Sequence, residues 1–347
     1  MKKHVLLFWF AIQNLFTFGQ DVHFTMFHAA PTVLNPAAAG IFNGTFRATA
    51  NYRSQWRSVT NKPFTTYSLT TDGSLYKNGS GNGYMGIGLS AYRDIAGQSG
   101  FGTTKINLTG SGIIKLDNYT TLSIGLNAGW GQQTIAPGEL QWDSQFDGQN
   151  YNSALSSGEN LNFANKSFFD VGTGIVWSYG TGASNMVSYD KFSATVGLAY
   201  HHASRPKLQT YNYDQQRMYS RIVLHGDMNF AQQYSRLAIQ PRFFAMFQGP
   251  SIEVNLGMMA RYLISDGSKY TGNIKGMAIA FGGYYRVADA FSPSIEFEIA
   301  GFSLGYSYDF NHSSLRNATN SFGGSELYIR FQNPNPFFQF SRRPRLR

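Results

Sequence analysis

The chain has 347 residues, a formal net charge of +9 and no cysteine, which excludes a disulfide framework and a lipid-modified N-terminal cysteine. Charged residues make up only 14%, against about a quarter in an ordinary soluble domain, while aromatic residues make up 16% and glycine occurs 37 times. Beyond the first 19 residues no apolar run approaches the ~20 residues of a membrane-spanning helix. This composition favours an outer-membrane β-barrel, with a large secreted β-sandwich as the soluble alternative.

The first 19 residues have the pattern of an export signal. Two lysines precede the apolar run Val5–Ile12, and Gly19 is small enough for the position before a cleavage site. We expect cleavage after Gly19, so that the exported chain begins at Gln20. A retained apolar anchor is the alternative, but polar residues such as Gln13 interrupt the run and make it a poor membrane span.

Residues 20–43 are apolar but fit neither a long helix nor a central strand. The stretch Phe24–Gly40 reads FTMFHAAPTVLNPAAAG, and its two prolines, Pro31 and Pro36, each interrupt regular structure. It is also too short and too interrupted to cross a bilayer as a helix. We expect a compact, bent segment in front of the first strand.

Residues 44–331 show the two-residue alternation that is typical of half-buried strands. In Thr121–Gly131 and in Phe302–Phe310, large apolar residues alternate with serine, glycine and other small or polar residues. Several such runs reach the ~9–11 residues that cross lipid, and aromatic residues gather at their ends. We therefore predict an all-β fold, a transmembrane antiparallel β-barrel of about fourteen strands. The strands are expected to begin near Gly44, Phe64, Gly83, Phe101, Tyr119, Phe168, Asp190, Arg217, Tyr234, Ser251, Ile274, Phe291, Phe302 and Gly323.

An even strand number places both termini of such a barrel on the periplasmic side. The connections Ile135–Ser167 and Arg205–Gln216 then become extracellular loops. The basic tail, residues 332–347, lies on the periplasmic side in this orientation. Its arginines are candidate docking residues, although the tail also has the composition of a solvated, disordered end; they are Arg342, Arg343, Arg345 and Arg347.

A fourteen-stranded barrel is too wide to be filled by its own small inward side chains, because a packed interior suits about eight strands. We therefore expect residues 20–43 to plug the lumen or to cover its periplasmic mouth. The alternative is a periplasmic lead that packs beneath the first strands. The candidate plug residues are Phe24, Phe27, Pro31, Asn35 and Pro36.

Charged residues of both signs fall on the inward positions of the predicted strands. An open selective pore is usually lined by one dominant sign, so the mixture favours a sealed lumen in which ion pairs hold a plug or a loop. An open channel is the alternative. The predicted inward residues are Arg47, Arg53, Lys105, Arg221, Arg236, Arg242, Arg261, Asp170, Asp227, Glu253, Glu296, Glu298, Asp309 and Glu326.

The longest predicted loop contains large aromatic residues among polar neighbours. Trp142, Phe146 and Tyr151 are surrounded by Asn, Ser, Gly and Gln, a combination that is common in interaction anchors. We treat them as candidate partner-binding residues, with Trp56 of the first loop packing beside them. The alternative is a cap, in which Trp142 folds back into the lumen.

No catalytic, metal-binding or cofactor-binding constellation stands out. His201, His202 and Ser204 lack a partner at a recognisable spacing, and the two histidines should point to opposite faces of a strand. His23 and His28 have no carboxylates at metal-ligand spacing. We therefore expect no enzyme activity and no cofactor. The positive net charge suits anionic lipopolysaccharide and anionic partner proteins, while nucleic acid is excluded as a partner of an exported membrane protein.

Several stretches form an ordered pattern along the chain. They are Phe24–Gly40, YRSQW, YSLTTDGSLYK, GIGLSAYRDIAGQSG, LSIGLNAGWGQQTI, LQWDSQFDG and the closing GFSLGYSYDF and GGSELYIRF. In this order they resemble the PorP/SprF family of type IX secretion membrane proteins of Bacteroidota. The resemblance covers almost the whole exported chain, although family barrels tend to stop at the last aromatic residue of the final strand, whereas this chain continues to Arg347.

The resemblance implies a non-enzymatic outer-membrane component of the type IX secretion system. Family members support export, retain a surface protein, or couple to the periplasmic lipoprotein ring. The expected partners are therefore other secretion components or a secreted surface protein, besides outer-membrane lipid and lipopolysaccharide. From composition alone, a diffusion porin or a hydrophobic-substrate transporter is an equal alternative.

Overall fold

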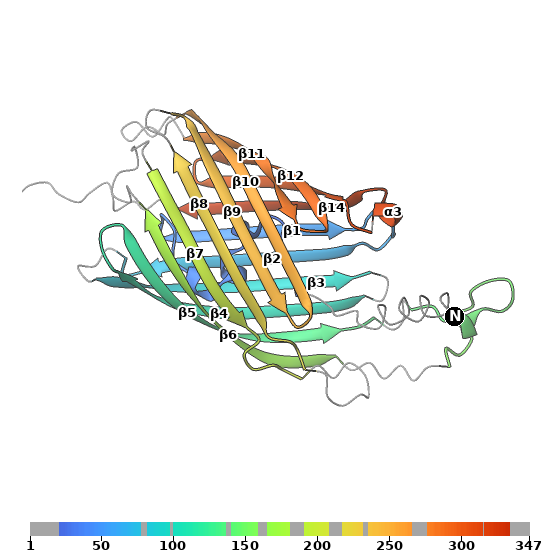
Figure 1. The fold of residues 1–347 in the computed structure, drawn as a ribbon. Helices are drawn as coiled ribbons and strands as arrows, with labels where there is room; N and C mark the ends of the chain where they lie inside the picture. Colours follow the sequence, from blue (N-terminus) through green and yellow to red (C-terminus); the bar gives the residue numbers. More distant parts are fainter. Residues whose placement is uncertain are drawn as a thin grey trace, which may run out of the picture.

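The computed structural model is a closed antiparallel barrel of fourteen strands (Figure 1). It describes residues 21–77, 82–97, 100–136, 140–158, 165–180, 191–207, 217–231, 235–265, 276–314 and 316–333. The predicted signal peptide and the arginines of the C-terminal tail lie outside these residues. Among the described residues, no helix is long and apolar enough to cross a membrane.

Each strand pairs with its neighbours in the sequence, and β1 pairs with β14 to close the barrel. The strands are β1 (Phe46–Gln55), β2 (Phe64–Leu75), β3 (Gly83–Ala96), β4 (Phe101–Lys115), β5 (Thr120–Thr134), β6 (Lys166–Gly180), β7 (Lys191–His201), β8 (Arg221–Ala231), β9 (Leu237–Gln248), β10 (Ser251–Ser265), β11 (Met277–Arg286), β12 (Ala290–Ile299), β13 (Phe302–Asn311) and β14 (Phe322–Asn333). The short helices are η1 (Phe27–Ala29), α2 (Pro31–Leu34), η2 (Pro36–Ala38), η4 (Asp143–Gln145) and α3 (Arg316–Thr319).

The predicted strand number is confirmed, and every predicted strand start lies within four residues of the observed one. The largest difference is at β8, which begins at Arg221 rather than near Arg217. The alternation already runs through Arg217, but this residue pairs with Lys207 in an isolated bridge of the preceding connection, outside the barrel wall.

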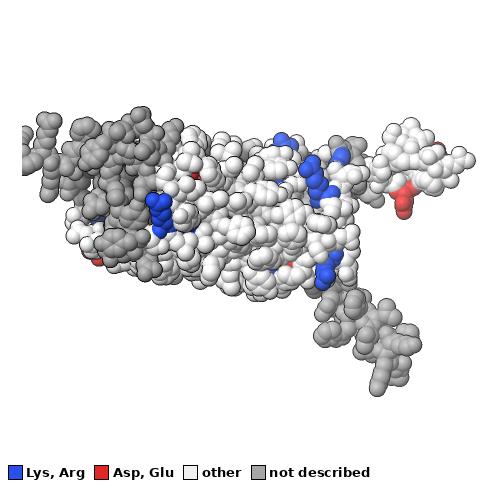
Figure 2. Space-filling model, turned by 90° about the horizontal axis from the view of Figure 1, so that it is seen from above, with Lys and Arg blue, Asp and Glu red and all other residues white. Residues whose placement is uncertain are grey.

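The barrel is apolar outside and polar inside, the reverse of a soluble protein. Along β5, Ile124 and Leu126 are 55% and 65% exposed, while Ser123 and Asn127, which point inward, are buried. The same alternation runs through most of the other strands. Figure 2 shows the result as a mostly uncharged surface between two ends at which basic residues gather. A belt of exposed apolar side chains around a polar interior is the arrangement that a lipid environment requires.

The two ends of the barrel differ, and we name them by their connections. At the terminal end β1 begins and β14 ends. At the loop end β1 ends and β14 begins, and this end carries the two longest connections, residues 135–165 and 202–220. These are the connections that the sequence predicted to be the long loops.

Candidate functional site: the segment in the barrel lumen

Residues 21–42, which we call the lumen segment, lie inside the barrel (dark blue in Figure 1). None of these residues is exposed. Pro31 and Pro36 each occupy the first turn of a short helix, α2 and η2, where a missing N–H costs nothing. The extended residue Asn35 separates these helices. The prolines therefore divide the segment into three short turns compact enough to fit within the wall.

The lumen segment runs the length of the lumen, from the loop end to the terminal end. Asp21 contacts His202 and Gln248, at the ends of β7 and β9. The other end of the segment, Gly40, donates its N–H to Asp72 near the end of β2, on the terminal side. Asp21 and the last strand residue, Asn333, therefore lie at opposite ends of the barrel.

A charge network holds the start of the segment at the loop end. The Asp21 carboxylate lies 3.0 Å from Arg221 and 2.8 Å from His202 Nε2. The other ring nitrogen of His202 lies 2.8 Å from Asp170, which also pairs with Lys105. The two ring nitrogens of His202 therefore bridge the carboxylates of Asp21 and Asp170. Burial alone would raise the pKa of Asp21, but Arg221 and His202 outweigh it and hold that pKa well below its usual range.

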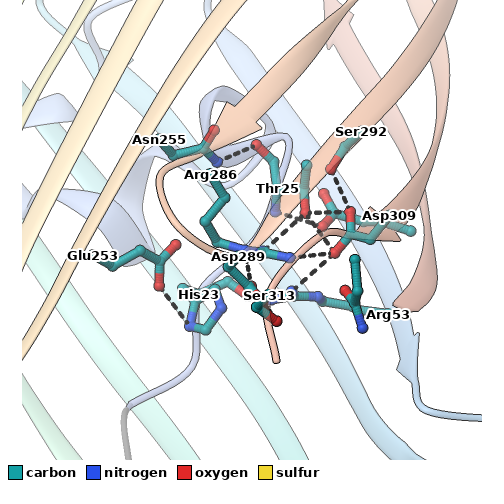
Figure 3. Close-up of polar contacts among 12 residues, drawn as sticks. His23, Thr25, Arg53, Glu253, Asn255, Arg286, Asp289, Ser292, Asp309 and Ser313 are labelled. Carbon is teal, nitrogen blue, oxygen red and sulfur yellow. Dashed lines mark hydrogen bonds and ion pairs between the residues drawn. The ribbon is translucent and has the colours of Figure 1, made fainter. Parts of the chain in front are cut away.

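The next turn is bound through its backbone by carboxylates of the last strands. Glu326 accepts hydrogen bonds from the N–H groups of Thr25 and Met26, at 2.6 and 2.9 Å. Asp309 accepts one from the Thr25 hydroxyl at 3.1 Å, and it also pairs with Arg286 at 2.6 Å (Figure 3). These bonds satisfy buried backbone groups that no regular secondary structure could satisfy here.

Apolar packing fixes the middle of the segment. Met26, Phe27 and Ala29 form one buried cluster with inward residues of β7 to β11 and of β14. The Phe27 ring stacks on Phe244, with ring centroids 5.4 Å apart, and meets Tyr284 edge-on. This cluster is the main apolar core inside a largely polar lumen, and the lumen segment supplies its centre.

Burial lowers the pKa of both histidines of the segment. Burial, together with the charges of Arg53 and Arg286, lowers the pKa of His23 well below its usual value. Burial and the charge of Arg242 lower the pKa of His28 as well. His28 Nδ1 lies 3.2 Å from Arg242 Nη1 and 3.1 Å from the Tyr284 hydroxyl, so this ring ties the segment to β9 and β11.

Asn35 joins the segment to the wall of β6 and β7. Its amide nitrogen donates to the carbonyl oxygens of Ile175 and Leu198, at 3.1 and 3.3 Å, and its amide oxygen accepts the N–H of Ala37. The side chain is completely buried. One amide therefore bonds two strands and caps the following turn at the same time.

The Ala-rich end of the segment lies directly against glycines of the wall. A Cβ added at Gly125 of β5 would lie 2.4 Å from the nitrogen of Ala37, and one added at Gly86 of β3 would lie 2.2 Å from the carbonyl oxygen of Ala39. Ser123 donates to the carbonyl of Ala37 at 2.8 Å. Small residues on both sides permit this backbone approach, which explains the sequence NPAAAG in physical terms.

All five candidate plug residues lie within this segment. Phe24 packs with Ala30 and Val33, and Phe27 with the main cluster. Pro31 and Pro36 begin the helices and Asn35 bonds the wall, as described above. These residues are neighbours in the sequence, so their placement in one segment was expected. The sequence does not indicate that this segment spans the full lumen.

Most predicted inward charges are buried in the lumen, with some differences. Arg236 is exposed and the side chain of Asp227 is 46% exposed, because both lie near the terminal end. The prediction missed Asp72, which pairs with Arg47 at 2.8 Å, and it did not include Arg286 among the lumen charges although the alternation places Arg286 on the inward face. Asp72 lies close to a strand end, where the inward alternation is hardest to follow.

The expectation that His201 and His202 point to opposite faces is wrong. Both are buried inside the barrel, where His201 lies 3.0 Å from the carbonyl oxygen of Leu34. β7 ends at His201, and His202 has a φ of 58°, which breaks the alternation and turns its ring inward. Both histidines therefore bind the lumen segment.

A family model described as "Type IX secretion system membrane protein PorP/SprF" matches residues 16–331. The chain belongs to this family. The resemblance seen in the sequence is thereby confirmed. This PorP/SprF chain is an outer-membrane component of the type IX secretion system. No curated protein matches it.

Solved outer-membrane proteins are similar to this PorP/SprF chain at low identity. The CymD monoaromatic hydrocarbon channel has a TM-score of 0.45 and 11% identity, covering 90% of this chain and 93% of its own. A Pseudomonas aeruginosa FadL homologue has a TM-score of 0.44 and 11% identity, covering 88% and 94%. BamA from Haemophilus ducreyi has a TM-score of 0.41 and 8% identity, covering 83% and 70%. At these scores the similarity carries no information about what the PorP/SprF chain binds.

The loop that carries Trp142, Phe146 and Tyr151 in the PorP/SprF chain folds on itself at the loop end. Gln145 is buried, and its side-chain amide donates to the carbonyl of Leu155 at 3.1 Å. Phe146 and Tyr151 pair across an isolated bridge and are 58% and 41% exposed. Figure 1 shows this loop, in green, standing off the barrel. Its aromatic side chains are therefore presented by an ordered unit.

Trp142 and Trp56 have different neighbours. Trp142 is half-buried beside η4. Trp56, with a φ of 59°, packs edge-on against Phe64, with ring centroids 4.6 Å apart. No ring contact joins the two tryptophans among the described residues. The described residues contain no group of three or more side chains that could ligate a metal ion.

Proposed function

We propose that this PorP/SprF protein is a non-enzymatic, sealed barrel that supports export or surface retention of a secreted partner, or couples to the periplasmic lipoprotein ring. The observation that carries the proposal is the lumen segment. It is bonded to inward side chains over the whole height of the barrel, from Gln248 to Asp72. A scaffold that holds partners requires a closed, rigid barrel, whereas a diffusion porin requires a free path.

The ion pairs of the lumen support a fixed segment rather than a mobile one. Five buried arginines of the wall each lie within 3.4 Å of a carboxylate: Arg47, Arg53, Arg221, Arg242 and Arg286. In one of these pairs the carboxylate, Asp21, belongs to the lumen segment itself. Removing the segment would leave buried charged groups without their partners, which is energetically costly. The segment therefore belongs to the folded state of the barrel.

The orientation that we propose places the terminal end, and with it the C-terminal tail, on the periplasmic side. An even number of strands puts the start of β1 on that side too. The lumen segment, however, runs back through the barrel, so strand number alone does not place the start of the exported chain. In this orientation Asp21 faces the outer side, and the residues before it lie outside the described part of the chain.

Partner binding is proposed at the loop end, through Trp142, Phe146 and Tyr151. Exposed aromatic rings on an ordered loop are suitable anchors for a protein surface. Trp56, which packs on Phe64, would shape the neighbouring rim. The periplasmic alternative is docking by the tail arginines at 342, 343, 345 and 347, through complementary charge. Anionic headgroups of lipopolysaccharide suit the basic residues that gather at the barrel ends (Figure 2).

Conductance in planar bilayers tests the proposal. The full-length protein should give little or no conductance, and deleting Gln20 to Gly40 should raise it. A deletion variant that still shows heat-modifiable migration on gels provides the folding control. Large, steady conductance of the full-length protein would instead favour the porin. Affinity purification from native membranes would then identify which secretion component or cargo is bound.

A further inference from the structure

A cavity remains in the lumen at the terminal end, beneath the lumen segment. It measures about 360 Å³ and lies between β10, β11, β12, β13 and β14. Helix η2 of the lumen segment contacts β4, β5, β6 and β7 instead, on the other side of the lumen. We call the cavity the vestibule. Its polar lining comes mainly from Asn43, Arg261, Glu298, Ser303, Arg330 and Gln332.

Arg330 is the arginine of the vestibule that lacks a carboxylate. Its Nη2 donates to the carbonyl oxygen of His28 at 2.8 Å, and its guanidinium lies 5.3 Å from the ring centroid of Tyr328. Its buried Nε has no hydrogen-bond partner among the described residues. The five arginines named above each have a carboxylate partner, whereas the described residues give Arg330 none. The Arg330 side chain is half-buried, and leaving its buried Nε and its charge without an acceptor is costly unless an anion joins it.

The second arginine of the vestibule is already compensated. Arg261 faces Glu298 with two guanidinium nitrogens, at 3.1 Å for Nε and 2.6 Å for Nη2. Both side chains are about 30% exposed, so this pair lies nearer the opening. Among the described residues, the charged groups that line the vestibule therefore sum to one positive charge, which belongs to Arg330.

We propose that the vestibule binds a carboxylate, presented by a ligand that enters from the terminal end. One guanidinium edge offers two parallel N–H donors, which match the two oxygens of a carboxylate. A single net positive charge matches a monoanion, whereas a phosphate dianion would meet uncompensated repulsion from Glu298. The free carboxylate of a small molecule and an acidic side chain of a protein partner share this chemistry. The proposal does not depend on the role in secretion.

Binding is measured on the full-length protein in detergent, by fluorine NMR with trifluoroacetate as the probe. Unlabelled acetate and inorganic phosphate serve as competitors, and a short peptide ending in glutamate tests access from a protein partner. The expected result is saturable binding that acetate and the peptide displace better than phosphate does. If acetate displaces the probe and the peptide does not, the site takes small carboxylates only.

Two variants change the charge of the vestibule in opposite directions. Arg330→Gln keeps a donor for His28 but removes the charge, and should weaken binding at least tenfold, because hydrogen bonds to charged groups are the strong ones. Glu298→Gln frees Arg261 and should strengthen binding about tenfold, a gain that loss of structure cannot imitate. Arg236→Gln changes an exposed arginine that does not line the vestibule and should leave binding unchanged.

The proposal is overturned by any of three results. The first is absence of saturable binding to the unmodified protein. The second is equal affinity in the two vestibule variants and in the Arg236 variant. The third is stronger displacement by phosphate than by acetate, which would assign the site to phosphate groups. If Arg330→Gln fails to give a heat-modifiable barrel, the Glu298→Gln variant still tests the proposal. Tighter probe binding by that variant supports the carboxylate site, and unchanged or weaker binding contradicts it.

Discussion

Gly125 of β5 is the position at which one methyl group should loosen the lumen segment. In Gly125→Ala the new Cβ would lie 2.4 Å from the nitrogen and 2.5 Å from the Cα of Ala37. Carbon atoms pack best at about 3.5–4.0 Å, so the segment would have to move by roughly 1 Å. Both neighbours are backbone atoms, and a rotamer change cannot remove the clash.

The energetic cost follows from the known cost of overpacking. Inserting a methyl group into a filled interior costs roughly 1–3 kcal/mol. Since every 1.4 kcal/mol is a factor of ten, the ratio of displaced to docked segment should rise roughly 5- to 150-fold. The barrel wall should be unaffected, because Gly125 keeps its strand pairing with Ser111 and Gly174.

A single engineered cysteine provides the assay, because the chain has none of its own. Val33→Cys places a thiol on the buried face of α2, with the parent side chain only 9% exposed. The rate of maleimide labelling in native membranes then reports displacement of the segment. The matched control is Gly112→Ala in the neighbouring strand, where an added Cβ meets nothing within 4 Å. Equal labelling of the Gly125→Ala and Gly112→Ala proteins would refute the close-packing account.

Three further predictions concern the anchors and the loop. Glu326→Ala should leave two buried backbone N–H groups unsatisfied and destabilise the docked segment by about 2–6 kcal/mol, seen as faster labelling of the same cysteine. A carboxyl whose pKa is lowered by folding stabilises the folded state at neutral pH and loses that contribution as pH falls through its folded pKa. The Asp21 anchor should therefore weaken only in strong acid. Asp21→Asn should abolish this loss of stability in acid. Replacing Trp142 and Phe146 by alanine should leave a folded, abundant barrel but release the retained surface protein into the medium. Lost heat-resistance in that variant would instead indicate a cap.

The barrel wall was predictable from the sequence, because each strand buries one face and exposes the other. Alternation such as Ser123, Ile124, Gly125 and Leu126 is visible in the sequence without knowledge of the neighbours. The even count and the strand starts followed from it. Where alternation breaks, as at His202 with its positive φ, the prediction failed.

The path of the lumen segment was not predictable, because it depends on contacts between residues far apart in the chain. The sequence shows that Pro31 and Pro36 prevent a long helix, but it does not show which wall receives each turn. That information is held by inward residues such as Glu326 and Gly125, whose identities are unremarkable for any barrel lumen. The uncompensated charge of Arg330 became visible only once the partners of the other arginines were known.

The bonds between the lumen segment and β14 have a consequence for how the protein is made. Thr25 and Met26 are held by Glu326, and the carbonyl of His28 is held by Arg330, about three hundred residues later in the chain. The first part of the exported polypeptide therefore lacks two of its anchors until the last strand has been inserted. β14 is also the strand that pairs with β1. Closing the barrel between β1 and β14 and anchoring the lumen segment therefore form a single step of biogenesis. A chain truncated before β14 can complete neither.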